Sequence, residues 1–381
     1  MAKFSDFVIR RQRVLLWGTS IIIVALAASL PRNELNDVFV HWFDKSIQFR
    51  SDTDFVVDNL TGLYTTEYSL SAGQSGGITE PEFLRETESF VEWMRAQPGV
   101  RHVRSYTDIM KRLNKNLHDD DPAEYRLPDN RELAAQYLLL YEMSLPYGLD
   151  LNNQINVDKS SVRLTATLDI LSTNEILALN ASAGNWLKAN AEHIDALPAS
   201  GAVVMFSHIG ARNIKAMIIG TTFALILISM ILMFALRSVK IGLNSLLPNL
   251  VPAAMGFGIW GIFVGEVGLS LSIVASVTLG IVIDDTVHFL SKYLRARREQ
   301  GLSSPEAVRY AFRTVGRALL VTSIILVCGF SILAFSKFAN NSDFGILSAI
   351  ILAFALIVDF LFLPPLLMKL DGANGNQSTS L

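Results

Sequence analysis

Cysteine is almost absent from this chain of 381 residues, and its one example, Cys328, cannot form a disulfide within the chain. The sequence also lacks a G-x-x-x-x-G-K-[ST] phosphate loop, an H-E-x-x-H zinc motif and a C-x-x-C pair. Direct ATP hydrolysis and a cysteine-based metal site therefore have no support. We expect neither an enzymatic site nor a bound metal or cofactor.

Charge is also scarce: 18% of the residues are charged and 51% are hydrophobic, which indicates a membrane protein with a soluble part. The net charge of −3 hides an asymmetry. Residues 32–210 hold 15 Lys and Arg against 26 Asp and Glu, whereas the rest holds 17 against 9. Because the basic residues fall in short stretches between apolar segments, they indicate sidedness in a membrane rather than binding of nucleic acid.

Six apolar segments are long enough to cross a bilayer, which takes about 20 helical residues. They lie at about 14–30, 214–236, 243–264, 269–290, 318–336 and 344–368. The first segment also resembles a signal peptide, because a basic stretch precedes it and Ala-Ala-Ser closes it. We favour a span, since the apolar core is long for a signal peptide and its removal would leave an odd number of spans.

The basic residues predict the orientation of these spans. If the spans alternate, one side receives Arg10, Arg11, Arg13, Arg237, Lys240, Lys292, Arg295, Arg297, Arg298, Arg309, Arg313, Arg317 and Lys369. The opposite side receives 265–268 and 336–343, with one lysine in total. We therefore expect cytoplasmic termini and an extracytoplasmic domain. The predicted order is a first span in 1–31, a soluble domain at 32–210, spans two to six in 211–370 and a disordered tail at 371–381.

The soluble domain reads as α+β. Alternating or β-rich stretches predict strands at 66–72, 100–106, 161–169 and 202–208, while helices are expected at 80–96 and from Thr173 onward. A helical, polar insertion occupies 107 to about 157. Without that insertion the order is β-α-β-β-α-β, the ferredoxin-like split unit. No catalytic constellation is visible, and the histidines lack the spacing of metal ligands (His41, His102, His118, His193 and His208).

Three acids lie inside predicted spans: Asp284, Asp285 and Asp359. An ionised carboxylate at the centre of a bilayer costs about 2.5–3.5 kcal/mol on insertion scales. Two neighbouring carboxylates cannot both ionise cheaply there, so the Asp284–Asp285 pair is expected to hold at least one proton. Such a pair suits a pathway for protons. The alternative is that these polar groups only hold spanning helices together, and for Asp359 we favour that packing role.

Helical geometry separates the roles of the two neighbouring aspartates, because adjacent residues diverge by about 100° around the axis. Gly280 and His288 stand four residues before and after Asp284, on nearly the same face. We predict that this face points into the helical bundle and that Asp284, Asp285 and His288 relay protons inward. The expected supporting residues are Gly280, Thr286, Thr322, Ser323 and Asp359.

The segment GIVIDDTVHFLSKY (280–293) resembles the G-x-x-x-D signature in the fourth spanning helix of resistance–nodulation–division (RND) transporters. The resemblance is closest to the branch of hydrophobe exporters that includes the MMPL lipid transporters. It extends to 49–62, 128–144, 236–261 and 315–336.

This resemblance implies export of hydrophobic or lipid-like molecules across a bacterial inner membrane, driven by protons rather than a cofactor. Asp284 matches the key acid of the family, whereas Asp285 stands where lipid-exporting relatives often have tyrosine. The resemblance also implies that residues 32–210 form a porter domain. That domain would contact the substrate or a periplasmic or outer-membrane lipid-transfer partner.

The usual RND protein has two six-span halves, and this chain resembles one C-terminal half. We therefore expect a homodimer, a separately encoded second half, or a fragment of a longer gene. Two alternatives from other classes remain. One is a lipid sensor or scaffold similar to the sterol-sensing arrangement, and the other is an accessory subunit of protein translocation.

Overall fold

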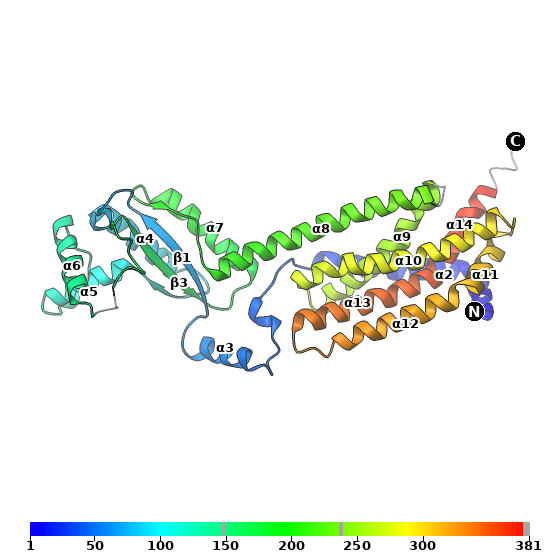
Figure 1. The fold of residues 1–381 in the computed structure, drawn as a ribbon, viewed down its shortest axis with the longest axis horizontal. Helices are drawn as coiled ribbons and strands as arrows, with labels where there is room; N and C mark the ends of the chain where they lie inside the picture. The colour runs from blue at the N-terminus through cyan, green and yellow to red at the C-terminus, as the bar shows by residue number, and fades with distance from the viewer. Residues whose placement is uncertain (147–149, 236–238, 376–381) are drawn as a thin grey trace. The chain divides into compact units, whose positions relative to one another are not determined.

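The computed structural model describes residues 1–146, 150–235 and 239–375 (Figure 1). The chain folds into two compact units. One unit, here called the helical unit, comprises Met1–Asp37, Trp42–Asp44 and the residues from Arg212 onward. The other, here called the sheet unit, comprises Val38–His41 and Lys45–Ala211. Each unit is described by itself.

Among the described residues, six helices are long and apolar enough to cross a membrane, which confirms the six predicted spans. They are α2 (Gln12–Ala27), α8 (Ala202–Ala235), α9 (Val239–Phe263), α10 (Leu269–Arg298), α12 (Gly316–Leu333), and α13 (Ala339–Ile357) with its continuation α14 (Leu363–Gly375). A π-helical turn, Val358–Phe362, joins α13 to α14. Of the basic residues that predict the orientation of the spans, Arg237 lies outside the described residues, and the side chain of Lys240 is not described.

The helices of the helical unit differ in how much of their surface packs inside it. Helices α9, α10 and α13 are the inner ones, whereas α2, α8 and α12 leave most of their side chains on the surface. A glycine permits the closest approach between α2 and α9, because a Cβ on Gly258 would lie 2.0 Å from the carbonyl oxygen of Leu26. The inner position of α10 matters most, since it carries the predicted acids.

Two short amphipathic helices, α1 (Ala2–Arg10) and α11 (Ser304–Thr314), complete the helical unit. Ser303 and Glu306 form a capping box that starts α11. The ring of Phe4 on α1 packs against Phe312 of α11, and Arg309 pairs with Asp6 at 2.7 Å. The N-terminal helix is thereby tied to the same end of the bundle as the loop after α10.

The sheet unit contains four strands and the helices around them. In chain order its elements are α3 (Gln48–Asn59), β1 (Tyr64–Ser71), α4 (Pro81–Arg95), β2 (Val100–Arg104), α5 (Tyr106–Leu117), α6 (Arg131–Ser144), β3 (Ser161–Leu168), α7 (Thr173–Asn190) and β4 (Asp195–Ala196). The strand order is β2-β3-β1-β4, and every neighbouring pair is antiparallel. The predicted helical insertion is seen as α5 and α6 between β2 and β3, although residues 147–149 lie outside the described part.

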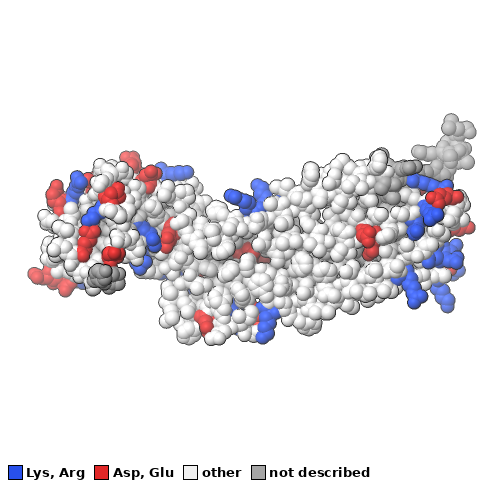
Figure 2. All heavy atoms as spheres, in the orientation of Figure 1, with Lys and Arg blue, Asp and Glu red and all other residues white. Residues whose placement is uncertain are grey.

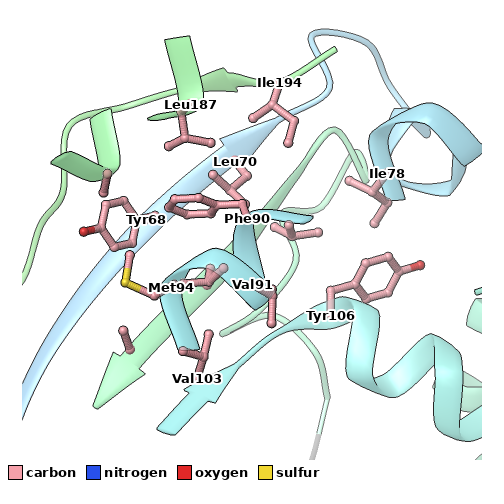
Figure 3. Close-up of a cluster of buried hydrophobic side chains, with 14 of the residues drawn as sticks. Tyr68, Leu70, Ile78, Phe90, Val91, Met94, Val103, Tyr106, Leu187 and Ile194 are labelled. Atoms are coloured by element: carbon pink, nitrogen blue, oxygen red, sulfur yellow. The ribbon is translucent and has the colours of Figure 1, made fainter. Parts of the chain in front are cut away.

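The core of the sheet unit follows from strand alternation. Every second residue of β1 is buried, including Tyr68 and Leu70, and these side chains meet Phe90 and Met94 of α4 (Figure 3). The Tyr68 hydroxyl donates to Asn180 Oδ1 at 2.7 Å, and burial raises the pKa of Tyr68 to about 12. These contacts form the hydrophobic core between β1 and α4.

The prediction of a last strand at 202–208 is wrong. These residues begin α8, and the fourth strand is the shorter β4, which pairs with the end of β1. Gly201 lies between them with φ of +123°, a conformation open mainly to glycine. The β-branched pair Val203 and Val204 favours a strand locally, but the continuous apolar run of α8 overrides that preference.

The predicted C-terminal tail begins inside a helix. Residues 371–375 continue α14, and Asp371 accepts hydrogen bonds from Tyr293 and, at 2.9 Å, from Arg297. Residues 376–381 lie outside the described residues. The contacts of Asp371 attach the end of α14 to the end of α10.

Candidate functional site

Helix α10 carries two polar faces, and the structure separates them as the angular spacing predicts. The first face contains Gly280, Asp284 and His288. His288 Nε2 lies 3.5 Å from Asp284 Oδ1, and the two side chains are 58% and 72% exposed. A Cβ on Gly280 would meet no other atom within 4 Å. The predicted acid–imidazole ladder therefore exists, but it faces the surface of this chain and not its interior.

The expectation that Asp284 points into the bundle is thus wrong for the single chain. The reason is the packing of α10, which buries the adjacent face against α12 and the last span. Figure 2 shows acidic atoms at the surface part-way along the helical unit, in an otherwise uncharged area.

The inward side of α10 contains Asp285 and Thr286, which lie about 100° apart and meet α12 and the last span, respectively. Ser323 of α12 places its Oγ 3.1 Å from Asp285 Oδ2 and 2.7 Å from the carbonyl oxygen of Leu319. A hydroxyl has one hydrogen, so Ser323 can donate to only one of these oxygens at a time. When it donates to Leu319, its lone pairs remain available to a protonated Asp285. Ser323 can therefore serve both protonation states of Asp285.

Asp359 completes this inner site from the π-helical turn of the last span. Its side chain is 2% exposed, and its Oδ1 accepts a hydrogen bond of 3.0 Å from the buried hydroxyl of Thr286. Its Oδ2 is buried and has no hydrogen-bond partner among the described residues. We name Asp285, Thr286, Ser323 and Asp359 the inner acid site.

The inner acid site contains two carboxyl groups and no basic partner. Within the described part of the chain, neither Asp285 nor Asp359 forms an ion pair with a lysine or arginine. An unpaired ion in a low-dielectric interior costs several kcal/mol. Asp359 is buried and Asp285 is half-buried, so two ionised carboxylates at this site would lack both full hydration and a lysine or arginine partner among the described residues.

One sequence expectation for this site needs revision. Thr322 is not part of it, because its hydroxyl is exposed and donates to the carbonyl of Ala318 in its own helix at 3.0 Å. The packing role favoured for Asp359 stays a prediction, while its contact with Thr286 and its buried oxygen without a partner among the described residues give it a place in the inner acid site. The only sequence signal for that place was an acid in an apolar span, because no periodicity reveals which residue it faces.

An apolar cavity of about 340 Å³ lies between α8, α9 and α10 within the helical unit. Its walls include Ile218 and Leu225 of α8, Phe257 of α9 and Leu279 of α10. The hydroxyls of Thr221 and Ser276 join α8 to α10 beside it. Leu279 directly precedes the polar stretch of α10, so one helix lines the cavity and carries both acid faces.

Comparison with known sequences agrees with this arrangement. The sequence model of the MMPL family matches residues 193–379, which include α8 to α14 and therefore five of the six spans. Residues 193–379 are an MMPL-family region. The family consists of transporters related to the RND type, and this confirms the resemblance drawn from the sequence.

A candidate membrane protein of Methanocaldococcus jannaschii is 27% identical over 148 residues. The aligned part covers 39% of this chain and 38% of that relative. Both acid faces and the parts of the cavity wall that come from α8, α9 and α10 lie on spans that the family model includes. The six apolar helices and this match indicate a membrane protein whose residues 193–379 resemble a family of transporters.

Proposed function

We propose that this chain is half of an RND-type transporter that uses protons to move hydrophobic or lipid-like molecules. The observation that carries the proposal is the inner acid site in the MMPL-family region, where two carboxyl groups have no lysine or arginine partner among the described residues. The apolar cavity beside α10 supports a hydrophobic substrate, since binding pockets for such ligands are concave and mostly apolar.

Proton loading at the inner acid site would change the packing of three helices. When Asp285 is ionised it accepts from Ser323, and when it is protonated it donates to the same hydroxyl. Ionisation of both Asp285 and Asp359 would place two like charges in a low-dielectric site and drive α10 away from the last span. A ligand or proton can shift a conformational equilibrium only through such a difference between two states.

The transport step follows from the double role of α10. Leu279 and Ser272 line the apolar cavity, while Asp285 and Thr286 belong to the inner acid site. A rotation or tilt of α10 on protonation would therefore change the cavity walls as well. We propose that this movement alternates the cavity between a state that admits a hydrophobic molecule and a state that releases it.

The outer face of α10 provides the argument for a second half. An exposed carboxylate would cost about 2.5–3.5 kcal/mol in contact with lipid, so Asp284 and His288 need a protein cover. Gly280 leaves room for a close approach of another helix. We propose that a second copy or a separately encoded half covers this face, and that Asp284 and His288 join the proton path there.

The distribution of charge supports the proposed sidedness. Figure 2 shows a cluster of basic side chains at the end of the helical unit that holds α1, α11 and α14. With that end in the cytoplasm of a bacterium, both termini are cytoplasmic and the sheet unit belongs to the periplasmic part.

We further propose that the sheet unit is a ferredoxin-like porter domain. Its element order without α5 and α6 is β-α-β-β-α-β, and its strands follow the order β2-β3-β1-β4. In this proposal the domain contacts the substrate or a periplasmic or outer-membrane lipid-transfer partner.

The test uses the full chain in vesicles that contain a fluorescent dye-labelled phosphatidylethanolamine. We expect an imposed pH gradient to accelerate movement of the labelled lipid between leaflets, measured by quenching of the exposed dye with dithionite. Asp285→Asn and Asp359→Asn are expected to lose this gradient-dependent component. The matched control is Asp343→Asn, an acid of the same last span about 24 Å away along the helix axis.

Movement at the wild-type rate in both Asp285→Asn and Asp359→Asn would overturn the proton-transfer proposal. A lipid sensor would bind the labelled lipid without moving it under a gradient, and it would tolerate both substitutions. Loss of movement in Asp343→Asn as well would point to a general loss of folding, so each variant is first compared by its helix content.

A further inference from the structure

A second cavity, of about 360 Å³, lies between the start of α2 and the first turns of α14. Its walls combine the polar side chains of Gln12, Arg13 and Lys369 with the apolar side chains of Leu16, Trp17 and Met368. Leu16 and Met368 are almost fully buried, whereas Arg13 and Lys369 are exposed. The cavity is therefore amphipathic, with a cationic rim and an apolar wall.

The rim of this cavity is positively charged and unneutralised. No aspartate or glutamate lines it, and neither Arg13 nor Lys369 forms an ion pair within the described part of the chain. Neighbouring basic residues behave differently, since Arg297 pairs with Asp371 and Arg309 pairs with Asp6. Arg13 and Lys369 therefore line the cavity without an acidic partner among the described residues, whereas the nearby Arg297 and Arg309 each have one.

Trp17 fixes the position of one of these cations. The ammonium group of Lys369 lies 5.2 Å from the centre of the Trp17 ring, within the range of a cation–π contact. Tryptophan is enriched where a membrane-spanning helix meets the headgroup layer, because its ring is apolar with one polar group. Trp17 lies one turn after Arg13 on α2, so the rim is placed at the depth of lipid headgroups.

We propose that this cavity binds an anionic phospholipid, with its phosphate on Arg13 and Lys369 and its glycerol and upper acyl chain against Leu16, Trp17 and Met368. Basic pockets between spanning helices bind anionic headgroups in this way. The arginine fork donates two parallel hydrogen bonds to phosphate oxygens, and the lysine adds a point charge. The bound lipid would link α2 to α14. This inference rests on the cavity alone and does not depend on the proposed transport.

The first test is lipid retention by the full-length purified protein, measured by native mass spectrometry after addition of dioleoyl-phosphatidylglycerol or dioleoyl-phosphatidylcholine. We expect the wild type to retain phosphatidylglycerol preferentially. The double variant Arg13→Gln, Lys369→Gln is expected to lose about tenfold in affinity for phosphatidylglycerol and little for phosphatidylcholine. The matched control, Lys292→Gln with Arg317→Gln, removes the same charge from the same end of the helical unit.

Three results would overturn the inference. They are equal retention of the two lipids, an unchanged affinity in the double variant, and an equal loss in the control pair. Complete displacement of phosphatidylglycerol by millimolar inorganic phosphate would also overturn the inference. The acyl chains of the lipid would then add nothing to its affinity for the cavity.

A second measurement keeps the inference testable if the double variant does not fold. In nanodiscs, brominated phosphatidylglycerol should quench the fluorescence of Trp17 more than brominated phosphatidylcholine does at the same mole fraction. Trp17→Phe isolates that signal from the other tryptophans. Equal quenching by both lipids contradicts the inference.

Discussion

Replacing Asp359 by leucine should separate stability from function. The buried Oδ2 of Asp359 has no hydrogen-bond partner among the described residues, and an unsatisfied buried polar group costs about 1–3 kcal/mol. The substitution removes that cost but also removes the hydrogen bond from the buried Thr286 hydroxyl, which is worth about 1 kcal/mol, and we expect this hydroxyl to donate instead to a carbonyl of its own helix. We therefore expect Asp359→Leu to raise the free energy of unfolding by about 0–2 kcal/mol while it abolishes gradient-dependent movement of labelled lipid.

The assay is thermal unfolding in one detergent, followed by intrinsic fluorescence. At about 2–4 °C per kcal/mol, the midpoint should rise by up to about 8 °C. Thr286→Val should act in the opposite direction, because it leaves both oxygens of Asp359 without a donor. In the Asp359→Leu background the effect of Thr286→Val should largely vanish, which a double-mutant cycle measures directly.

A fall of more than about 2 kcal/mol in Asp359→Leu would refute this reasoning, because Asp359 would then be a satisfied structural group. Independent effects of the two substitutions would refute the contact itself. A natural protein retains a destabilising buried acid mainly where function requires it, so higher stability with lost transport is the diagnostic combination.

Three further predictions concern other parts of the chain. Ser172→Ala should destabilise the sheet unit by about 1 kcal/mol, measured by denaturant unfolding, because Ser172 and Glu175 form the capping box of α7. Glu86 raises the pKa of His193 above 6.5, so this pair stabilises the fold below pH 6.5, and the contribution is lost as pH rises through the raised pKa. NMR titration should show the pKa of His193 fall in Glu86→Gln. Gly280→Leu should leave the melting temperature unchanged but weaken assembly, measured by light scattering, and an unchanged assembly would contradict the proposed interface.

Sequence reasoning worked best where one physical pattern dominates. The six spans were predictable because a bilayer demands long apolar helices. The strands β1 and β3 were predictable because alternation fixes which side chains face the core. The prediction for 202–208 was wrong because a stretch of seven residues, most of them β-branched or apolar, can form either a strand or part of a helix. Here it continues into the long apolar helix α8.

The candidate site shows a different limit. Helical spacing correctly separates Asp284 from Asp285, but it says nothing about which of them faces the neighbouring helices. The contact that identifies Asp285 as the inward-facing acid is with Ser323, which lies 38 residues away in the sequence and is brought close only by the fold. The π-helical turn that carries Asp359 leaves no periodic signal either, although such turns occur frequently at functional sites.

The two faces of α10 together give a physical reason for the two adjacent acids. An acid on the inner face can control packing only within one half, through α12 and the last span. An acid on the outer face can control packing only against whatever covers Gly280, Asp284 and His288. Adjacent aspartates about 100° apart on one rigid helix therefore allow protonation on one face to move the other. On this argument, Asp285→Asn should disturb the conformational change within a half, whereas Asp284→Asn should disturb its transmission to the second half.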